Sequence, residues 1–191
     1  MELILGSALA LASTGVVVIG ATRRRRSMAR HPSPTFVFAD LVGYTALTEE
    51  RGDQAAARLA REFRRTMCGL SREHGARQVK SMGDGVMIWA PDAGAAVALA
   101  GRAVDEVGAR PDLLPVRVGV HTGPAVMEGC DWYGSAVNVA ARLAGAAEPN
   151  QALVSAATHT AARGQLQGRL VAPREIALRG VGQPISVWRL A

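Results

Sequence analysis

Two aspartates in this sequence stand where a predicted strand meets a turn. Asp40 follows the apolar run TFVFA, and Asp84 lies between two glycines in the bend that joins RQVKSM to GVMIWA. If the first strand lies beside this hairpin, the two carboxylates converge at one edge of a sheet. Paired hard oxygen ligands suit Mg²⁺ or Mn²⁺, with substrate phosphates and water completing the shell. Taken singly, each acid is more simply a cap or turn residue, so the metal-site prediction depends on the pairing.

The residues after Asp40 predict a place for phosphate. LVGYTAL is typical of a turn that leads into a helix, and the backbone N–H groups of Gly43, Tyr44 and Thr45 could bind an anion there. The chain has neither GxxxxGK[ST] nor GxGxxG, which excludes a P-loop and a Rossmann site.

Asn138 and Arg142 lie one helical turn apart in SAVNVAARLAG and therefore share a helix face. An amide and a guanidinium side by side can hold a sugar oxygen and a phosphate. The helix alone leaves a second interpretation open, which is an ordinary solvated polar stripe.

The hydrophobic patterning predicts the elements that would position these residues. It indicates strands at 35–42, 77–82, 85–90, 116–123, 152–155 and 185–190, and helices at 53–74, 93–109, 135–146 and 156–163, with CDWYG as a loop. The order strand, helix, strand, strand, helix, strand predicts an α+β fold with a ferredoxin-like βαββαβ core and a C-terminal extension. Such folds host many functions, so function must be argued from the site.

An apolar segment precedes this domain. Residues 3–22 carry no charge, and as a helix they would be about 30 Å long, enough to span a bilayer. The arginines at 23–26 follow the segment, which predicts a transmembrane signal anchor at 1–22 and a basic juxtamembrane linker at 23–34 that meets anionic headgroups. Residues 35–191 are then expected on the cytoplasmic side of the inner membrane, as the domain of a single-pass protein. A cleaved signal peptide would want its positive charge ahead of the run, where Glu2 stands.

The charge and composition argue against nucleic acid and against a zinc site. The formal charge is +6, but removing the five arginines between residues 23 and 30 and Glu2 leaves 17 basic and 15 acidic residues. A nearly neutral body with 4% aromatic residues does not fit a nucleic-acid-binding surface. Cys68, Cys130 and the four histidines match no metal spacing, so both cysteines are predicted to be reduced and His121 to be a structural strand residue.

Four stretches taken together resemble the catalytic domain of class III nucleotidyl cyclases. They are FADLVGYTAL, VKSMGDGVM, VRVGVHTG and DWYGSAVNVAARL, in that order, and the resemblance covers roughly residues 35 to 190. It implies an adenylyl or guanylyl cyclase that forms a cyclic nucleotide and pyrophosphate. It also implies two divalent metal ions, Mg²⁺ or Mn²⁺, held by Asp40, Asp84 and the Leu41 carbonyl.

The resemblance further implies how the nucleotide is bound. Lys80 and Asp131 fall on the pair that selects adenine, and Asn138 and Arg142 fall on the transition-state pair. Arg179 replaces a lysine of the family that binds the triphosphate. Lys80 is the only lysine in the chain, and its donor suits N1 of adenine while Asp131 accepts from the exocyclic amine. Guanine reverses that pattern, so ATP is the expected substrate.

The resemblance also implies that each site is shared in a head-to-tail homodimer. The metal acids would come from one subunit and the nucleotide-binding residues from the other, so a monomer would be inactive. Three alternatives stay open: a non-catalytic cyclase-like module that binds nucleotide or dimerises, a guanylyl cyclase, and a diguanylate cyclase, although the GGDEF run of the last is absent.

Overall fold

The computed structural model describes residues 33–162, 164–166 and 170–190. In chain order the elements are β1 (Thr35–Leu41), α1 (Tyr44–Arg51), α2 (Asp53–Glu73), β2 (Arg77–Met82), β3 (Gly85–Ala90), α3 (Ala93–Gly108), β4 (Val116–Thr122), β5 (Val126–Glu128), β6 (Asp131–Tyr133), α4 (Ser135–Ala146), β7 (Gln151–Ser155), α5 (Ala156–Ala161), β8 (Leu170–Ile176) and β9 (Ile185–Leu190).

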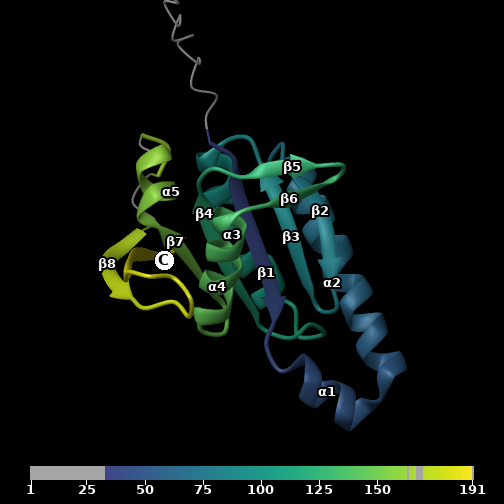
Figure 1. Cartoon of the computed structure of the whole chain (residues 1–191). Coiled ribbons are helices and arrows are strands. Elements are labelled where there is room, and N and C mark those ends of the chain that lie inside the picture. Colours follow the sequence, from purple (N-terminus) through teal and green to yellow (C-terminus); the bar gives the residue numbers. More distant parts are fainter. Residues whose placement is uncertain (1–32, 163, 167–169, 191) are drawn as a thin grey trace, which may run out of the picture.

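The main sheet has the strand order β2-β3-β1-β4-β7-β9-β8, and β1 lies in its interior (Figure 1). Strands β1 to β4 pair antiparallel with one another, and β7 pairs parallel with β4. The first four strands have the order and directions of a ferredoxin-like core, and β7, β9 and β8 extend it. The predicted α+β core and its C-terminal extension are therefore confirmed.

Alternation along β1 decides which way Asp40 faces. Val37 and Ala39 belong to the core that α2 and α3 cover, whereas Phe36 and Phe38 pack with α4 on the other side of the sheet. Successive side chains of a strand point to opposite faces, so Asp40 shares the face of Phe38. The acid thus lies on the α4 face of the sheet.

Helices α2 and α3 form because their apolar positions repeat at helical spacing. On α2 the buried residues are Ala56, Ala60, Phe63, Met67, Leu70 and Ser71. Helix α3 begins after Asp92, whose carboxylate accepts a hydrogen bond from the Ala95 N–H at 2.7 Å and satisfies a free donor of the first turn. Both helices bury one face of the sheet.

Helix α4 lies unusually close to β4. A Cβ atom on Gly119 would lie 2.2 Å from the backbone nitrogen of Ala144, so only glycine allows this approach. The helix presents small residues such as Ala140 and Ala144 to the sheet and leaves its polar side chains outside. The chain therefore fixes α4 directly over β1 and β4.

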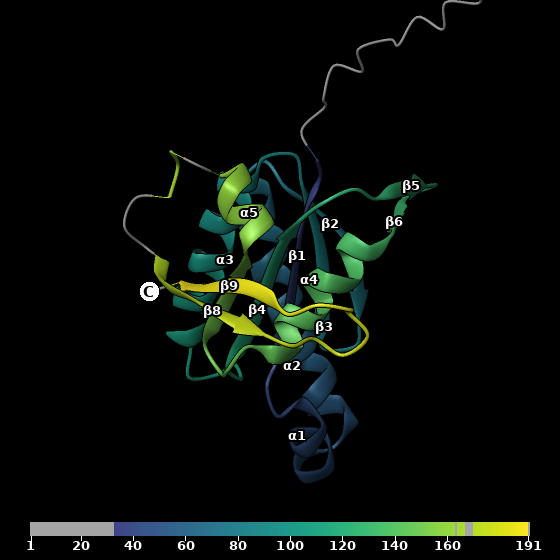
Figure 2. The ribbon, with the colours of Figure 1, turned by 60° about the vertical axis from the view of Figure 1, so that its left-hand side comes forward.

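The helix expected after LVGYTAL is α1, and Gly52 separates it from α2. Other elements differ from the predictions. CDWYG is not a loop, because Asp131–Tyr133 pairs with Val126–Glu128 as a two-stranded arm that stands away from the main sheet (Figure 2). Strand β8 was not predicted because it contains Pro173, which an edge strand with a register shift tolerates.

The described part of the chain contains no helix long and apolar enough to cross a membrane. The predicted anchor at 1–22 and almost all of the predicted linker at 23–34, including its arginine cluster, lie outside the described residues.

Candidate active site

The end of β1 and the turn between β2 and β3 bring Asp40 and Asp84 together. Strand register sets Asp40 opposite Gly85, the residue after Asp84. A Cβ atom on Gly85 would lie 3.2 Å from Asp40 Oδ1, and Gly83 has a φ of 62°, so both glycines suit this tight turn. The predicted convergence of the two acids follows from this register.

The two carboxylates interact directly. Burial raises the pKa of Asp84, and the nearby negative charge of Asp40 and a side-chain hydrogen bond with it raise the pKa further. Two facing carboxylates repel each other, and a divalent cation between them would relieve that repulsion. The described residues contain no cluster of three or more His, Cys, Asp or Glu side chains suited to a metal. The donor set thus fits an ion that takes its remaining ligands from phosphate and water.

Sequence reasoning missed Arg117, which lies on β4 opposite Asp40. Its guanidinium donates two hydrogen bonds to Asp40 Oδ2, at 3.1 Å from Nε and 2.6 Å from Nη2. We refer to Asp40, Asp84 and Arg117 as the acid edge. A usable signal was present in VRVGVHT, because a full positive charge inside an otherwise apolar strand requires a partner.

Lys80 and Asp131 form an ion pair on the same side of the molecule. Lys80 Nζ lies 2.6 Å from Asp131 Oδ2, and the other carboxylate oxygen accepts a hydrogen bond from the Trp132 N–H at 2.8 Å. The hydrogen bond from Lys80 and the one from Trp132 lower the pKa of Asp131. The side chains keep 38% and 26% of their surface exposed, which leaves the pair open to a ligand. The sequence resemblance assigns these two residues to adenine selection, and we refer to them as the adenine pair.

Helix α4 and the segment before β9 carry the remaining polar residues. Asn138 is exposed and Arg142 half-buried, and a Cβ atom on Gly180 would lie 3.1 Å from Arg142 Nη2. This contact brings the segment that carries Arg179 next to Arg142. Within residues 33–162, 164–166 and 170–190, the side chains of Asn138, Arg142 and Arg179 make no hydrogen bond or ion pair. They are available to a ligand.

The segment after Asp40 is a turn that leads into a helix, as predicted. Gly43 has a φ of 85° and precedes α1, whose first residue is Tyr44, and no side chain caps this helix. The Leu41 side chain is buried in the core, so only its carbonyl could contact a metal. No side chain caps the N–H groups at Gly43, Tyr44 and Thr45, so they remain candidates for the predicted anion contact near the acid edge.

The sequence as a whole matches a known family of domains. The profile of the adenylate and guanylate cyclase catalytic domain matches residues 27–190. The chain belongs to this family. The resemblance seen in the four sequence stretches is confirmed, and so is the prediction of a cyclase-type enzyme domain.

Two curated relatives show how far the similarity of this cyclase domain extends. The pH-sensitive adenylate cyclase of Mycobacterium tuberculosis is 34% identical over 165 residues, which is 82% of this chain and 40% of that protein. An adenylate cyclase of Glutamicibacter nicotianae is 36% identical over 148 residues, 76% of this chain and 36% of that protein. The chain therefore spans less than half the length of these relatives.

Solved structures share the fold. Adenylate cyclase structures from Trypanosoma brucei in their monomeric state include one with a TM-score of 0.76 at 23% identity, covering 84% of this chain and 88% of that one. An adenylate/guanylate cyclase/hydrolase from Silicibacter pomeroyi gives a TM-score of 0.73 at 26% identity, covering 82% and 95%.

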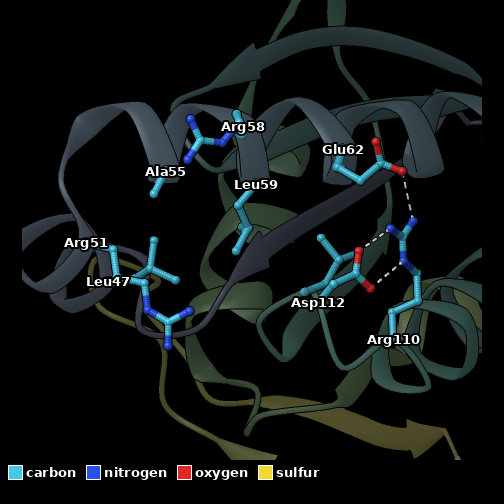
Figure 3. Close-up of a pocket in the computed structure, with 9 residues that line it drawn as sticks. Leu47, Arg51, Ala55, Arg58, Leu59, Glu62, Arg110 and Asp112 are labelled. Carbon is cyan, nitrogen blue, oxygen red and sulfur yellow. Dashed lines mark hydrogen bonds and ion pairs between the residues drawn. The ribbon is translucent and has the colours of Figure 1, made fainter.

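Two hollows of this cyclase domain lie on different parts of its surface. One of about 350 Å³ lies between the acid edge and α4 and is lined by Asp40, Arg117 and Gly145 among others. A hollow of about 420 Å³ lies elsewhere, between α1, α2 and the loop after α3 (Figure 3). There Arg110 donates to Glu62 at 3.0 Å and also binds Asp112. None of the predicted site residues lines this second hollow.

His121 lies at the opposite end of β4 from the acid edge. It is the register partner of Phe36, and its Nδ1 lies 2.8 Å from the Ser155 hydroxyl oxygen. Ser155 in turn contacts Thr158, whose hydroxyl accepts a hydrogen bond from Thr122 at 3.1 Å. Burial lowers the pKa of His121 to about 4, so the ring is neutral at pH 7. These contacts support the predicted structural role.

Proposed function

We propose that the protein is an adenylyl cyclase that converts ATP to 3′,5′-cyclic AMP and pyrophosphate. The observation that carries the proposal is the pair of facing carboxylates, Asp40 and Asp84, on the same sheet face as the unpartnered Asn138 and Arg142. A cation site beside a phosphate-binding amide and guanidinium is what nucleotide cyclisation requires.

Asp40, Asp84 and the Leu41 carbonyl would hold two divalent ions, Mg²⁺ or Mn²⁺. When bound, these ions would lower the pKa of the ribose 3′-hydroxyl and neutralise the charge on the departing pyrophosphate. Arg117 balances the charge of Asp40 in the free protein. If Asp40 held a cation, the Arg117 guanidinium could donate instead to a neighbouring phosphate oxygen.

In the reaction the 3′-oxygen attacks the α-phosphorus, a new P–O bond closes the ring, and the bond to the β-phosphate breaks. Arg142 stabilises the charge that develops on the α-phosphoryl oxygens, and Asn138 orients the ribose. No side chain of the motifs acts as the base, so the proton of the hydroxyl passes to water or to a substrate oxygen. Arg179 and the N–H groups at Gly43 to Thr45 bind the triphosphate.

The adenine pair accounts for the choice of ATP. Its ammonium and carboxylate atoms are 2.6 Å apart, which suits two neighbouring atoms on the edge of one base. Lys80 donates to N1 of adenine, and Asp131 accepts from the exocyclic amine. Guanine has a donor at N1 and an acceptor at O6, so it would meet Lys80 with a donor and Asp131 with an acceptor.

A second copy of the chain completes each site. Large apolar side chains stay exposed on the arm and near the acid edge. On the arm Val126 is 69% and Met127 57% exposed, and Met82, which lies near Asp40, is 44% exposed. The indole N–H groups of Trp89 and Trp132 are buried without a hydrogen-bond partner among the described residues. These features suit burial against a partner. In a head-to-tail homodimer the acid edge of one subunit would face the adenine pair and α4 of the other, giving two equivalent sites.

The segment before the domain is proposed to hold it at a membrane. We assign residues 1–22 to a transmembrane anchor, 23–34 to a basic linker and 35–191 to the catalytic domain on the cytoplasmic side of the inner membrane. Carbonate extraction of cell membranes tests this assignment, because an integral anchor keeps the full-length chain in the pellet whereas an extracted chain contradicts it.

The function is tested by assaying the full-length chain and residues 33–191 with ATP and GTP, each with Mg²⁺ and Mn²⁺, and identifying the cyclic product. We expect cyclic AMP from ATP and no product without a divalent ion. Cyclic GMP as the main product would make the protein a guanylyl cyclase. Nucleotide binding without any cyclic product would make it a non-catalytic module.

A further inference from the structure

The adenine pair has an aromatic neighbour, Tyr133. The centroid of its ring lies 5.9 Å from Lys80 Nζ, within the range of a cation–π contact. Tyr133 follows Asp131 by two residues on β6, and alternate residues of a strand share a face. The Tyr133 side chain is also among the groups that lower the pKa of Asp131, after Lys80 and the Trp132 N–H. Tyr133 therefore lies beside the ammonium of the pair and on the same strand face as its carboxylate.

Packing does not explain Tyr133. Its side chain is 53% exposed, whereas its neighbour Trp132 stacks on Trp89 with ring centroids 5.9 Å apart and meets Phe36 edge-on at 5.6 Å. Trp132 thus fixes the arm to the sheet. The exposed Tyr133 ring can therefore interact with the Lys80 ammonium beside it.

Lys80 needs such a restraint. Its ammonium is carried on a flexible four-carbon stem, the side chain is 38% exposed, and an exposed ion pair alone holds such a chain weakly. A ring beside the ammonium limits the directions in which the stem can point, because the cation is attracted to the ring face.

We propose that Tyr133 is a positioning residue for nucleotide selection, holding the Lys80 ammonium beside the Asp131 carboxylate so that donor and acceptor meet the adenine edge together. The inference rests on the proposed function of the adenine pair. It adds to that function a third residue, which acts through Lys80 rather than on the base itself.

The first test compares Tyr133→Leu, which removes the ring, with Tyr133→Phe and Tyr133→Trp, which keep one. The readout is the ratio of ATP to GTP affinity of the full-length chain, measured by equilibrium binding without turnover. We expect Tyr133→Leu to lower this ratio about fivefold, and the two aromatic variants to stay within about twofold of the wild type. An unchanged ratio in Tyr133→Leu would overturn the proposal, as would an equal loss in all three variants.

Because this test measures binding, it separates the two proposals. A wild-type chain that prefers ATP but forms no cyclic product contradicts the cyclase function, and the ratio in Tyr133→Leu still decides the role of Tyr133. A wild-type chain without any preference for ATP in binding overturns the selective role of the adenine pair and of Tyr133, whereas the identity of the cyclic product still decides the cyclase function.

The second test uses Lys80 as a unique probe, since it is the only lysine in the chain. Isotope-labelled lysine gives a single side-chain signal in NMR spectra of the full-length protein. A proton held over an aromatic face is shifted upfield, so we expect upfield ε-methylene protons in the wild type and in Tyr133→Phe, and their return toward the free-lysine position in Tyr133→Leu. The same shift in Tyr133→Leu as in the wild type would show that the ring does not hold Lys80.

Discussion

The acid edge and the outer face of α4 differ in how their polar side chains are balanced. At the acid edge, strand register fixes Asp40 against Arg117 and brings Asp84 against Asp40, so each group has a partner within the chain. On α4, the side chains of Asn138 and Arg142 make no hydrogen bond or ion pair with any described residue. One region has its charged groups paired within the chain, and the other leaves its hydrogen-bond donors exposed.

This difference indicates what each region lacks. The acid edge holds two carboxylates but one guanidinium, and the pKa of Asp84 is raised first by burial and then by the negative charge of Asp40. Positive charge added there is stabilising. On the α4 face the donor groups of Asn138 and Arg142 have no acceptor partner among the described residues, and phosphate oxygens can supply one. A metal–triphosphate complex carries both the missing cations and the missing acceptors, but it can use both regions only if they face each other.

Removing the charge of either acid tests the first region most severely. We expect Asp40→Asn and Asp84→Asn each to lower kcat by about 10³-fold or more, because the cation site loses half its carboxylates. Cyclic AMP formation at saturating Mn²⁺ is the measurement, with ATP affinity as the control. A variant that retains a tenth of the wild-type rate would exclude its residue from the cation site.

Reversing the charge of Lys80 tests whether the adenine pair selects the base. We expect Lys80→Glu to lower kcat/KM for ATP by about 100-fold, because two acids would then face the acceptor at N1. Lys80→Arg, which keeps the positive charge, is the matched control and should lose less than about tenfold. Unchanged cyclic AMP formation by Lys80→Glu would remove this residue from the nucleotide site.

The pH dependence of folding separates the far end of β4 from the acid edge. The pKa of His121 is about 4 in the folded protein, against 6.5 as its ordinary value. Below pH 6.5 the unfolded chain therefore binds a proton that the folded ring does not, so this contribution to stability is complete above pH 6.5 and is lost as the pH falls toward 4.

Between pH 7.5 and pH 5 we expect the free energy of unfolding to fall by about 2 kcal/mol through this residue. The measurement is urea unfolding of the wild type and His121→Gln at both values, and the difference between their pH responses isolates the ring. Equal pH responses in the two proteins would mean that His121 is not buried as neutral imidazole.

The smallest expected effect is a difference in the free energy of unfolding between variants of the two acids. At pH 7, Asp84→Asn should raise the free energy of unfolding by about 0.5 kcal/mol, because it removes a repelled charge that is partly screened by solvent. Asp40→Asn should lower it by about 1 kcal/mol, because Arg117 loses a charged partner. Urea unfolding without divalent ions measures both. Equal shifts would mean that the repulsion at the acid edge is negligible.

Sequence patterns predicted much of this arrangement because it depends on local signals. The apolar run of β1 and the Gly83-Asp84-Gly85 turn indicated a strand and a hairpin, and the ferredoxin-like order then placed Asp40 near Asp84. The face shared by Asn138 and Arg142 followed from helical spacing alone.

The parts that were missed depend on register or on weak strands. The contact of Arg117 with Asp40 joins residues 77 positions apart, and only the pairing of β1 with β4 sets it. The strands of the arm have three residues each, too short for a periodic pattern. The approach of Gly180 to Arg142 depends on how β9 returns to the sheet, which no local pattern encodes.

The central claim is that the acid edge of one chain works with the α4 face of another. It is tested most directly by mixing two inactive variants, Asp84→Asn and Asn138→Ala, under conditions in which subunits exchange. In an equal mixture half of the dimers are heterodimers, and each has one intact site of two, so we predict about a quarter of the wild-type activity. Co-purification of differently tagged subunits confirms exchange, and a mixture that exchanges yet stays inactive would contradict the shared site.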